Sequence, residues 1–537
     1  MENKPEYAPT LKISEGFIRG TTQLVDEHKL HLYQGIKYGR RVQSKAERFQ
    51  RALPVEPWND VYDASIVRCS CPQLGLDIPY KGYYSFEYSE DSLFLNVWRP
   101  AKESSSGPRA VMFYIYGGGF KTGSVFKITN DGRYISARGD VIVVTANYRV
   151  GAFGFMYGHD ELAPANLGIQ DIILALKWVQ RNISAFGGDP NRVTIFGNSA
   201  GSSGVATLLL SPLTKGLFQR AILQSGAPLN RTTHKSELLP RMRDLARELG
   251  CTSQNVMEII EYLKKQSIED ILNITDKFEL KFEPVYGDEV IPVLPINALL
   301  SGSFNGDVDL MYGVSKDEGL GFVGSIIPEL KTDDVVVNDE NVKDFIKRLF
   351  EYKNETFGDE AADFYISRYK LPSNPTLLDY KLLINNVYGE YNIGCRTILF
   401  AEYFALNSRS SSKRKYYSFM TIAPAEVHIM GALADNWPVA CHADELYYLF
   451  TITRQRTEED KRLSHQIIGA WANFAKYADP GPIQDVHWAP ALTSPITLGS
   501  TNYMELNYQC RMMYDQYKEK IPFWANKIGH PKDTIQK

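Results

Sequence analysis

The stretch from residue 193 to residue 210 constrains the fold of this chain more than any other. Residues 193–196 (VTIF) read as a strand and residues 205–210 (VATLLL) are compatible with a helix. Between them lies a Gly-x-Ser-x-Gly motif, Gly197 to Gly201, centred on Ser199. A serine in this context occupies a strained strand-to-helix turn, where the two glycines allow a close backbone approach. The alternative is an ordinary strand-to-helix turn, so Ser199 needs partners elsewhere in the chain.

Buried strands and helices alternate around this motif. Continuous apolar runs at residues 111–116 and 141–148 indicate buried strands, and further strands are predicted at residues 221–226, 308–314 and 415–419. A helix is predicted over residues 171–185, with apolar residues in helical spacing. This order predicts an α/β fold, with a central, mostly parallel twisted sheet flanked by helices. Sites in such sheets gather at the carboxyl ends of the strands.

Helical insertions are predicted at about residues 256–280 and 335–410, where they would form a cap over the site. The chain contains no internal repeat and no disordered linker long enough to separate domains. We therefore expect residues 1–537 to form a single domain.

Two residues are candidates to activate Ser199. Glu318 lies just past the carboxyl end of the predicted strand at 308–314, and His442 lies in a loop after the strand near 416–419. A base must take the serine proton, and a carboxylate must orient that base. The order serine, acid, histidine is that of α/β-hydrolases. The alternatives are a solvated loop charge at Glu318 and a structural histidine at 442.

A glycine run supplies a candidate oxyanion hole. Gly117, Gly118 and Gly119 follow the strand at 111–116. Residues without side chains allow consecutive N–H groups to turn toward a substrate oxygen. Gly118, Gly119 and Ala200 would supply three donors, whereas the alternative is a flexible hairpin.

Motifs along the chain resemble those of the type-B carboxylesterase/cholinesterase family. They are Gly35-Ile36-x-Tyr38, Arg48-Phe49, Ser89-Glu90-Asp91, Gly117 to Phe120, Asn147-Tyr148-Arg149, Phe186 to Pro190, Gly197 to Gly201, Asp317-Glu318-Gly319, His442 to Glu445 and Trp471 to Phe474. The matches run in the family's order from about residue 10 to 520. The resemblance implies an α/β-hydrolase fold, a deep gorge, and Ser199, Glu318 and His442 as the catalytic triad.

Departures from the family's patterns bear on the substrate. Where cholinesterases have a choline-binding tryptophan, this chain has Lys81, Tyr83 and Tyr84, so we expect a carboxylesterase-like member and no acetylcholine specialist. The resemblance places Phe278 and Leu280 at an apolar acyl pocket. Asn198 replaces the glutamate common beside the nucleophile, which should weaken the attraction for cations.

The cysteines bear on the cellular compartment. Ser92 and Tyr262 stand where the resemblance implies two disulfide partners, so only Cys395 and Cys510 match a family pair, and whether they are bridged stays open. No signal peptide and no transmembrane segment is recognised in the sequence. We therefore expect a cytoplasmic protein.

The leading prediction is a serine carboxylesterase that forms an acyl-enzyme on a small-molecule ester and requires no metal or organic cofactor. An acyltransferase with the same triad is the first alternative. A non-catalytic binding protein like the neuroligins is the second, although those typically lack a complete triad. The net charge of −4 does not indicate nucleic-acid binding. The sequence does not indicate the oligomeric state.

Overall fold

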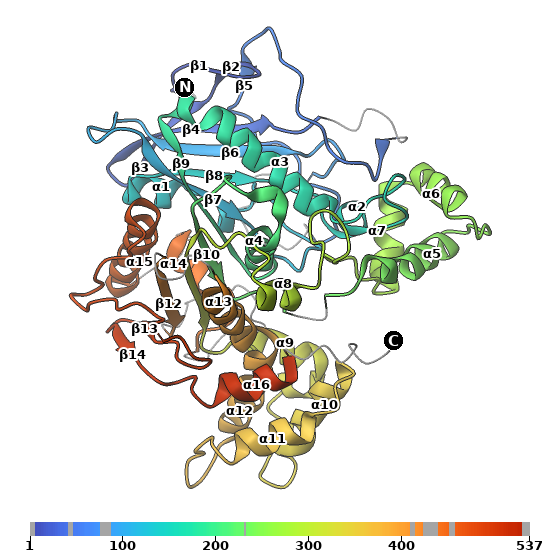
Figure 1. The fold of residues 1–537 in the computed structure, drawn as a ribbon, viewed down its shortest axis with the longest axis vertical. Coiled ribbons are helices and arrows are strands. Elements are labelled where there is room, and N and C mark those ends of the chain that lie inside the picture. The colour runs from blue at the N-terminus through green and yellow to red at the C-terminus, as the bar shows by residue number, and fades with distance from the viewer. Residues whose placement is uncertain are drawn as a thin grey trace.

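The computed structural model describes residues 6–40, 47–75, 87–229, 232–408, 414–422, 439–450, 457–493 and 495–528. Its centre is an 11-stranded sheet (Figure 1). Across the sheet the strands are β14 (Arg511–Met513), β13 (Tyr503–Leu506), β12 (Tyr416–Thr421), β11 (Asp309–Ser315), β10 (Arg220–Gln224), β9 (Gly188–Asn198), β7 (Arg109–Ile115), β8 (Ile142–Ala146), β6 (Phe94–Pro100), β4 (His28–Lys37) and β3 (Thr21–Val25).

The sheet is parallel at its centre and antiparallel at both edges. Every neighbouring pair from β13 to β8 is parallel, whereas β14 and the strands β6, β4 and β3 pair antiparallel. Every residue of β7, β8 and β11 is buried, as the continuous apolar runs predicted for strands covered on both faces. A small separate sheet contains β1 (Leu11–Ile13), β2 (Gly16–Arg19) and β5 (Tyr62–Asp63).

Helices cover both faces of the sheet. One layer contains α1 (Arg133–Gly139), α14 (Glu445–Leu449) and α15 (Glu458–Tyr477), and the other contains α3 (Leu167–Asn182), α4 (Ala200–Leu210), α8 (Pro295–Ser301) and α13 (Cys395–Asn407). The predicted α/β fold with a mostly parallel sheet is confirmed. The main hydrophobic cluster contains residues from Ala8 to Ala525, and two small clusters lie apart from it. The single domain stays a prediction.

The remaining helices form two groups outside the sheet layers (Figure 1). The first contains α5 (Leu238–Glu248), α6 (Val256–Lys265) and α7 (Ile268–Lys277), beside α2 (Gly151–Phe155). The second contains α9 (Leu320–Ile326), α10 (Val342–Tyr352), α11 (Gly358–Ile366) and α12 (Leu377–Gly389), with α16 (Lys520–Ile528) nearby. The predicted insertion at 335–410 extends too far, because α13 packs on β11 and belongs to the sheet layer.

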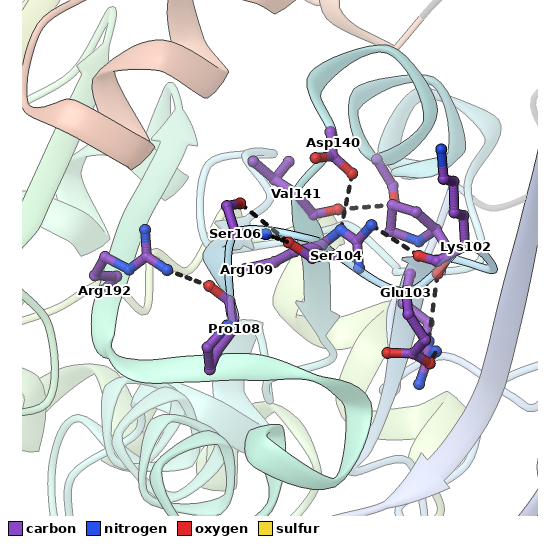
Figure 2. Close-up of polar contacts among 12 residues, drawn as sticks. Lys102, Glu103, Ser104, Ser106, Pro108, Arg109, Asp140, Val141 and Arg192 are labelled. Atoms are coloured by element: carbon purple, nitrogen blue, oxygen red, sulfur yellow. Dashed lines mark hydrogen bonds and ion pairs between the residues drawn. The ribbon is translucent and has the colours of Figure 1, made fainter.

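Arginine contacts secure the amino-terminal edge of the parallel strands, as Figure 2 shows. Arg109, the first residue of β7, donates from Nε to Asp140 Oδ1 and from Nη2 to the carbonyl oxygen of Lys102, both at 2.8 Å. Arg192 donates to the carbonyl oxygen of Pro108. These contacts fix the loop before β7 at the sheet edge opposite to the predicted site, so we assign them a structural role.

None of the six cysteines, all of which lie in the described part of the chain, forms a disulfide. Cys395 and Cys510, which match a disulfide pair of the family that the sequence resembles, are among them. Cys71 Sγ accepts a hydrogen bond from Ser92 Oγ at 2.9 Å, so the serine at the position of the missing family cysteine makes a polar contact instead. Within the described residues, no helix is long and apolar enough to cross a membrane.

Candidate active site

Four parallel strands bring their carboxyl ends to one edge of the sheet. Asn198 at the end of β9 lies opposite Gln224 of β10, and Gln224 lies opposite Gly313 of β11. Ile115 at the end of β7 lies opposite Gly197. The segments that follow these strands therefore start side by side, and they contain the predicted glycine run, Ser199 and Glu318.

Ser199 occupies a strained turn between β9 and α4. Its φ of 59° and ψ of −126° are a conformation that non-glycine residues rarely adopt. Its N–H donates to the carbonyl oxygen of Gln224, and its own carbonyl accepts from Ser203 N–H, both at 2.9 Å. The turn that the motif predicts is therefore present, and hydrogen bonds on both sides hold it.

The two motif glycines are required by close backbone packing. A Cβ on Gly197 would lie 2.6 Å from the carbonyl oxygen of Ile115, and one on Gly201 would lie only 2.1 Å from the same atom. Real Cβ atoms do not approach backbone this closely. The end of β7 therefore lies directly against the turn that carries Ser199.

We expect Gly201→Ala to lower the free energy of unfolding by about 3 kcal/mol, the upper end of the usual cost of overpacking, because its methyl group would collide with rigid backbone. The chemical denaturation midpoint measures this loss. The matched control is Gly204→Ala in the same helix, where the nearest atoms lie at 3.6 and 4.0 Å. There the change should be within about 1 kcal/mol and stabilising, since alanine favours helix. Equal losses in both variants would contradict the packing described here.

The loops after β11 and before α14 bring Glu318 and His442 together. Glu318 Oε2 and His442 Nδ1 are 2.5 Å apart, and the two side chains are 3% and 1% exposed. The loops also join through their backbones, because Asp317 N–H donates to the carbonyl oxygen of Ala440 at 2.9 Å. Glu318 Oε1 accepts from Ser225 Oγ at 2.5 Å and from Ser315 N–H at 2.7 Å. Both carboxylate oxygens are thus held.

Glu318 changes the acidity of His442. Burial lowers the pKa of the histidine, but the adjacent carboxylate and its hydrogen bond outweigh burial, so the pKa of His442 is raised above 6.5. The other ring nitrogen, Nε2, is buried without a hydrogen-bond partner among the described residues. The described residues therefore show no hydrogen bond from His442 to Ser199 Oγ.

The glycine run lies against the serine turn. A Cβ on Gly117 would lie 2.9 Å from Ser199 Cβ. Gly118 and Gly119 follow with positive φ values of 116° and 63°, and both are exposed. Ala200 is the first residue of α4, so its N–H has no acceptor within the helix. The three predicted donor residues thus lie beside the turn, while their role as an oxyanion hole stays a prediction.

The residues predicted to bind substrate have different surroundings. Asn198 is 2% exposed, and its Nδ2 donates to Glu445 Oε1 at 2.6 Å. Phe278, directly after α7, is 41% exposed, and Leu280 is partly buried. Tyr83 and Tyr84 lie outside the described residues, as does Lys81. A substrate contact for any of these residues stays a prediction.

Two residues beside the candidate triad were not expected from the sequence. Ser225 follows β10 with a φ of 58° and donates to Glu318. Glu445 accepts hydrogen bonds from Asn198 and Gln224. The sequence offered only indirect signals. Ser225 is the last residue but one of the predicted strand at 221–226, and Glu445 is part of the motif that contains His442.

Of two cavities along α4, one lies near the sheet edge that carries Ser199 and the other lies away from it. One of about 50 Å³ lies beside the serine turn and is lined by Phe120, Ser203 and Thr207, among others. A larger one, of about 860 Å³, lies at the other end of α4, where Leu210 and Ser211 line it together with α8. Within the described residues, no group of three or more His, Cys, Asp or Glu side chains could hold a metal ion.

The sheet order, the serine turn after β9 and the acid–histidine pair after β11 and β12 define an α/β-hydrolase fold. The model of the carboxylesterase family matches residues 7–524. A cholinesterase of Mus musculus is 32% identical over 95% of this chain and 85% of its own length. An acetylcholinesterase of Bungarus fasciatus is 31% identical over 99% of this chain and 89% of its own length. The chain belongs to the carboxylesterase family.

Proposed function

We propose that this chain is a serine esterase that hydrolyses carboxylic esters with Ser199 as the nucleophile, His442 as the base and Glu318 as the residue that orients the base. One observation carries the proposal: a strained serine turn follows β9 and a buried Glu318–His442 pair follows β11 and β12, at the same edge of the parallel sheet. Membership of the carboxylesterase family supports it, since the similar proteins include a cholinesterase and acetylcholinesterases.

The reaction begins when His442 Nε2 takes the proton of Ser199 Oγ, which attacks the ester carbonyl carbon. The N–H groups of Gly118, Gly119 and Ala200 stabilise the resulting oxyanion. The intermediate collapses, the alcohol leaves with the proton from His442, and an acyl-enzyme remains. Water, activated by the same histidine, then releases the acid.

The contacts of Glu318 support its proposed chemical role. It keeps a proton on His442 Nδ1, so that Nε2 is the nitrogen that acts as the base, and it stabilises the imidazolium. Hydrogen bonds between a base and its nucleophile often tighten only in the substrate complex, and the unpartnered Nε2 is available for one.

For the substrate, we propose uncharged esters, because Asn198 replaces a carboxylate that would attract cations. The apolar acyl site at Phe278 and Leu280 is part of the same proposal. A cytoplasmic location also remains a proposal, supported by the six described cysteines, none of which is in a disulfide, as suits a reducing compartment.

The test combines two measurements on the purified protein. We expect it to hydrolyse p-nitrophenyl acetate and to be labelled at Ser199 by a fluorophosphonate probe. A panel of esters of varied acyl length and alcohol size then defines the substrate. Failure of both hydrolysis and labelling would refute the proposal, and fast transfer to an added alcohol or amine with negligible hydrolysis would make the protein an acyltransferase.

The raised pKa of His442 predicts the pH dependence of the reaction. Only the neutral imidazole accepts the serine proton, so kcat/KM should rise with pH and level off above an apparent pKa higher than 6.5. Initial rates from about pH 5 to pH 9 measure this profile. Samples returned from acid to alkaline buffer should recover full activity, which separates titration from unfolding. An apparent pKa well below 6.5 would contradict the assignment.

A further inference from the structure

Besides Glu318, a buried carboxyl group contacts the residue that precedes Ser199, and it has no role in the reaction described above. Glu445 is the first residue of α14 and is 1% exposed. Its Oε1 accepts from Asn198 Nδ2 at 2.6 Å and from Gln224 Nε2 at 3.0 Å. Its Oε2 is buried without a hydrogen-bond partner among the described residues.

These hydrogen bonds connect the segments that carry the proposed catalytic groups. Asn198 directly precedes Ser199, and the carbonyl oxygen of Gln224 accepts the Ser199 N–H. Glu445 itself lies only three residues after His442. Its carboxyl group therefore joins β9, which ends just before the serine, to the segment that carries the histidine.

The amide orientation of Gln224 is fixed from the other side. Trp471 of α15 donates from Nε1 to Gln224 Oε1 at 3.3 Å. Indole is a donor only, so the amide oxygen must face Trp471 and the amide nitrogen must face Glu445. This series of hydrogen bonds thus extends from α15 through β10 to α14, and the donor and the acceptor are defined in each bond.

We propose that Glu445 is a positioning residue that, held by Asn198 and Gln224, sets the separation and mutual orientation of the Ser199 turn and the His442 loop. This proposal rests on the proposed function. Asn198 has a definite role in this arrangement, because its amide donates to Glu445, whereas a glutamate at 198 would place a second carboxylate against it.

Glu445 also acts on the titration of the site. Burial and the nearby Glu318 raise the pKa of Glu445 to about 7, while His442 and the Gln224 amide oppose that rise. Among the described residues, the titratable groups that interact with Glu445 or His442 also include Tyr114 and Asp444. The charge of Glu445 favours protonated His442, so its removal should lower the pKa of the histidine.

The experiment compares Glu445→Gln, Glu445→Ala and Asn198→Ala in the full-length protein. Glu445→Gln keeps an acceptor oxygen but loses the charge. It should keep kcat/KM at about pH 8 within about threefold, while the acid limb of the pH profile moves to lower pH by about 0.3–1 unit. Glu445→Ala and Asn198→Ala should each lower kcat and the rate of fluorophosphonate labelling by about 10- to 100-fold. The double variant Glu445→Ala/Asn198→Ala should lose no more activity than Glu445→Ala alone, because both substitutions remove the same Asn198–Glu445 hydrogen bond.

The matched control is Glu402→Gln, which changes a carboxyl group of similar burial on α13, in the helix layer on the other face of the sheet from α14. Glu402 also has a pKa raised to about 7 by burial, and it accepts from Gly499 N–H at 2.8 Å and from Thr501 Oγ at 2.6 Å. This variant should leave the pH profile of kcat/KM unchanged. The same shift in Glu402→Gln as in Glu445→Gln would overturn the proposal.

Other outcomes separate this proposal from the proposed function. If the wild type is active and the folded Glu445 and Asn198 variants keep its rate and pH profile, the positioning role is overturned and the esterase assignment stands. If the wild type neither hydrolyses esters nor reacts with the probe, both are overturned. Should Glu445→Ala fail to fold, Glu445→Gln and Asn198→Ala decide the question by the same criteria.

Discussion

Ser199→Ala should lower kcat for ester hydrolysis by about 10⁴–10⁶-fold, the loss expected when the nucleophile of a serine hydrolase is removed. The oxyanion hole and substrate binding would account for the residual rate. Fluorophosphonate labelling should disappear completely, because no other residue would attack the probe. Initial rates on p-nitrophenyl acetate and mass spectrometry of the labelled protein measure the two effects.

The matched control for this variant is Ser211→Ala. Ser211 caps the other end of α4, where its Oγ accepts from Leu213 N–H at 3.4 Å. The variant should keep wild-type kcat and full labelling, with a loss of stability of no more than about 1 kcal/mol. Labelling that persists in Ser199→Ala would mean that another residue reacts with the probe, and the nucleophile would have to be reassigned.

The central fold was predictable because its strands are buried on both faces. The apolar runs at 111–116, 141–148 and 308–314 became β7, β8 and β11, shifted by one or two residues. The strands β13 and β14 carried no such signal, since they are short and depend on pairing with β12. The helix predicted over 171–185 starts earlier, at Leu167, and tightens into a 3₁₀ turn from Ile183.

The sequence names the members of the candidate triad, whereas their surroundings could not be predicted from it. Its members follow strand ends, so the sequence indicates that they converge, and the structure places Glu318 against His442. The partners that hold them are not marked in the sequence. Ser225 is 93 residues from Glu318, and Asn198 is 247 residues from Glu445. Such contacts depend on the register of β9, β10 and β11, which hydrophobic patterns do not specify.

Two adjacent buried carboxyl groups allow a test of which carboxylate orients His442. Asp317 and Glu318 are both 3% exposed, yet only Glu318 contacts His442. Asp317 Oδ2 instead accepts from Ala440 N–H at 3.2 Å, and burial raises the pKa of this carboxyl. Burial alone therefore does not distinguish the two, whereas the contact with the histidine does.

Glu318→Gln should lower kcat/KM by about 10³–10⁴-fold while the fold is kept. Glu318 Oε1 accepts two hydrogen bonds, so the glutamine oxygen would stay there and its NH₂ would face His442 Nδ1. An amide donor opposite Nδ1 favours the tautomer with the proton on Nε2, which cannot take the serine proton. Asp317→Asn, the matched control, should lose less than about tenfold, because its carboxyl group does not touch the imidazole. Steady-state kinetics compare the variants, and a larger loss in Asp317→Asn would transfer the role of the acid to Asp317.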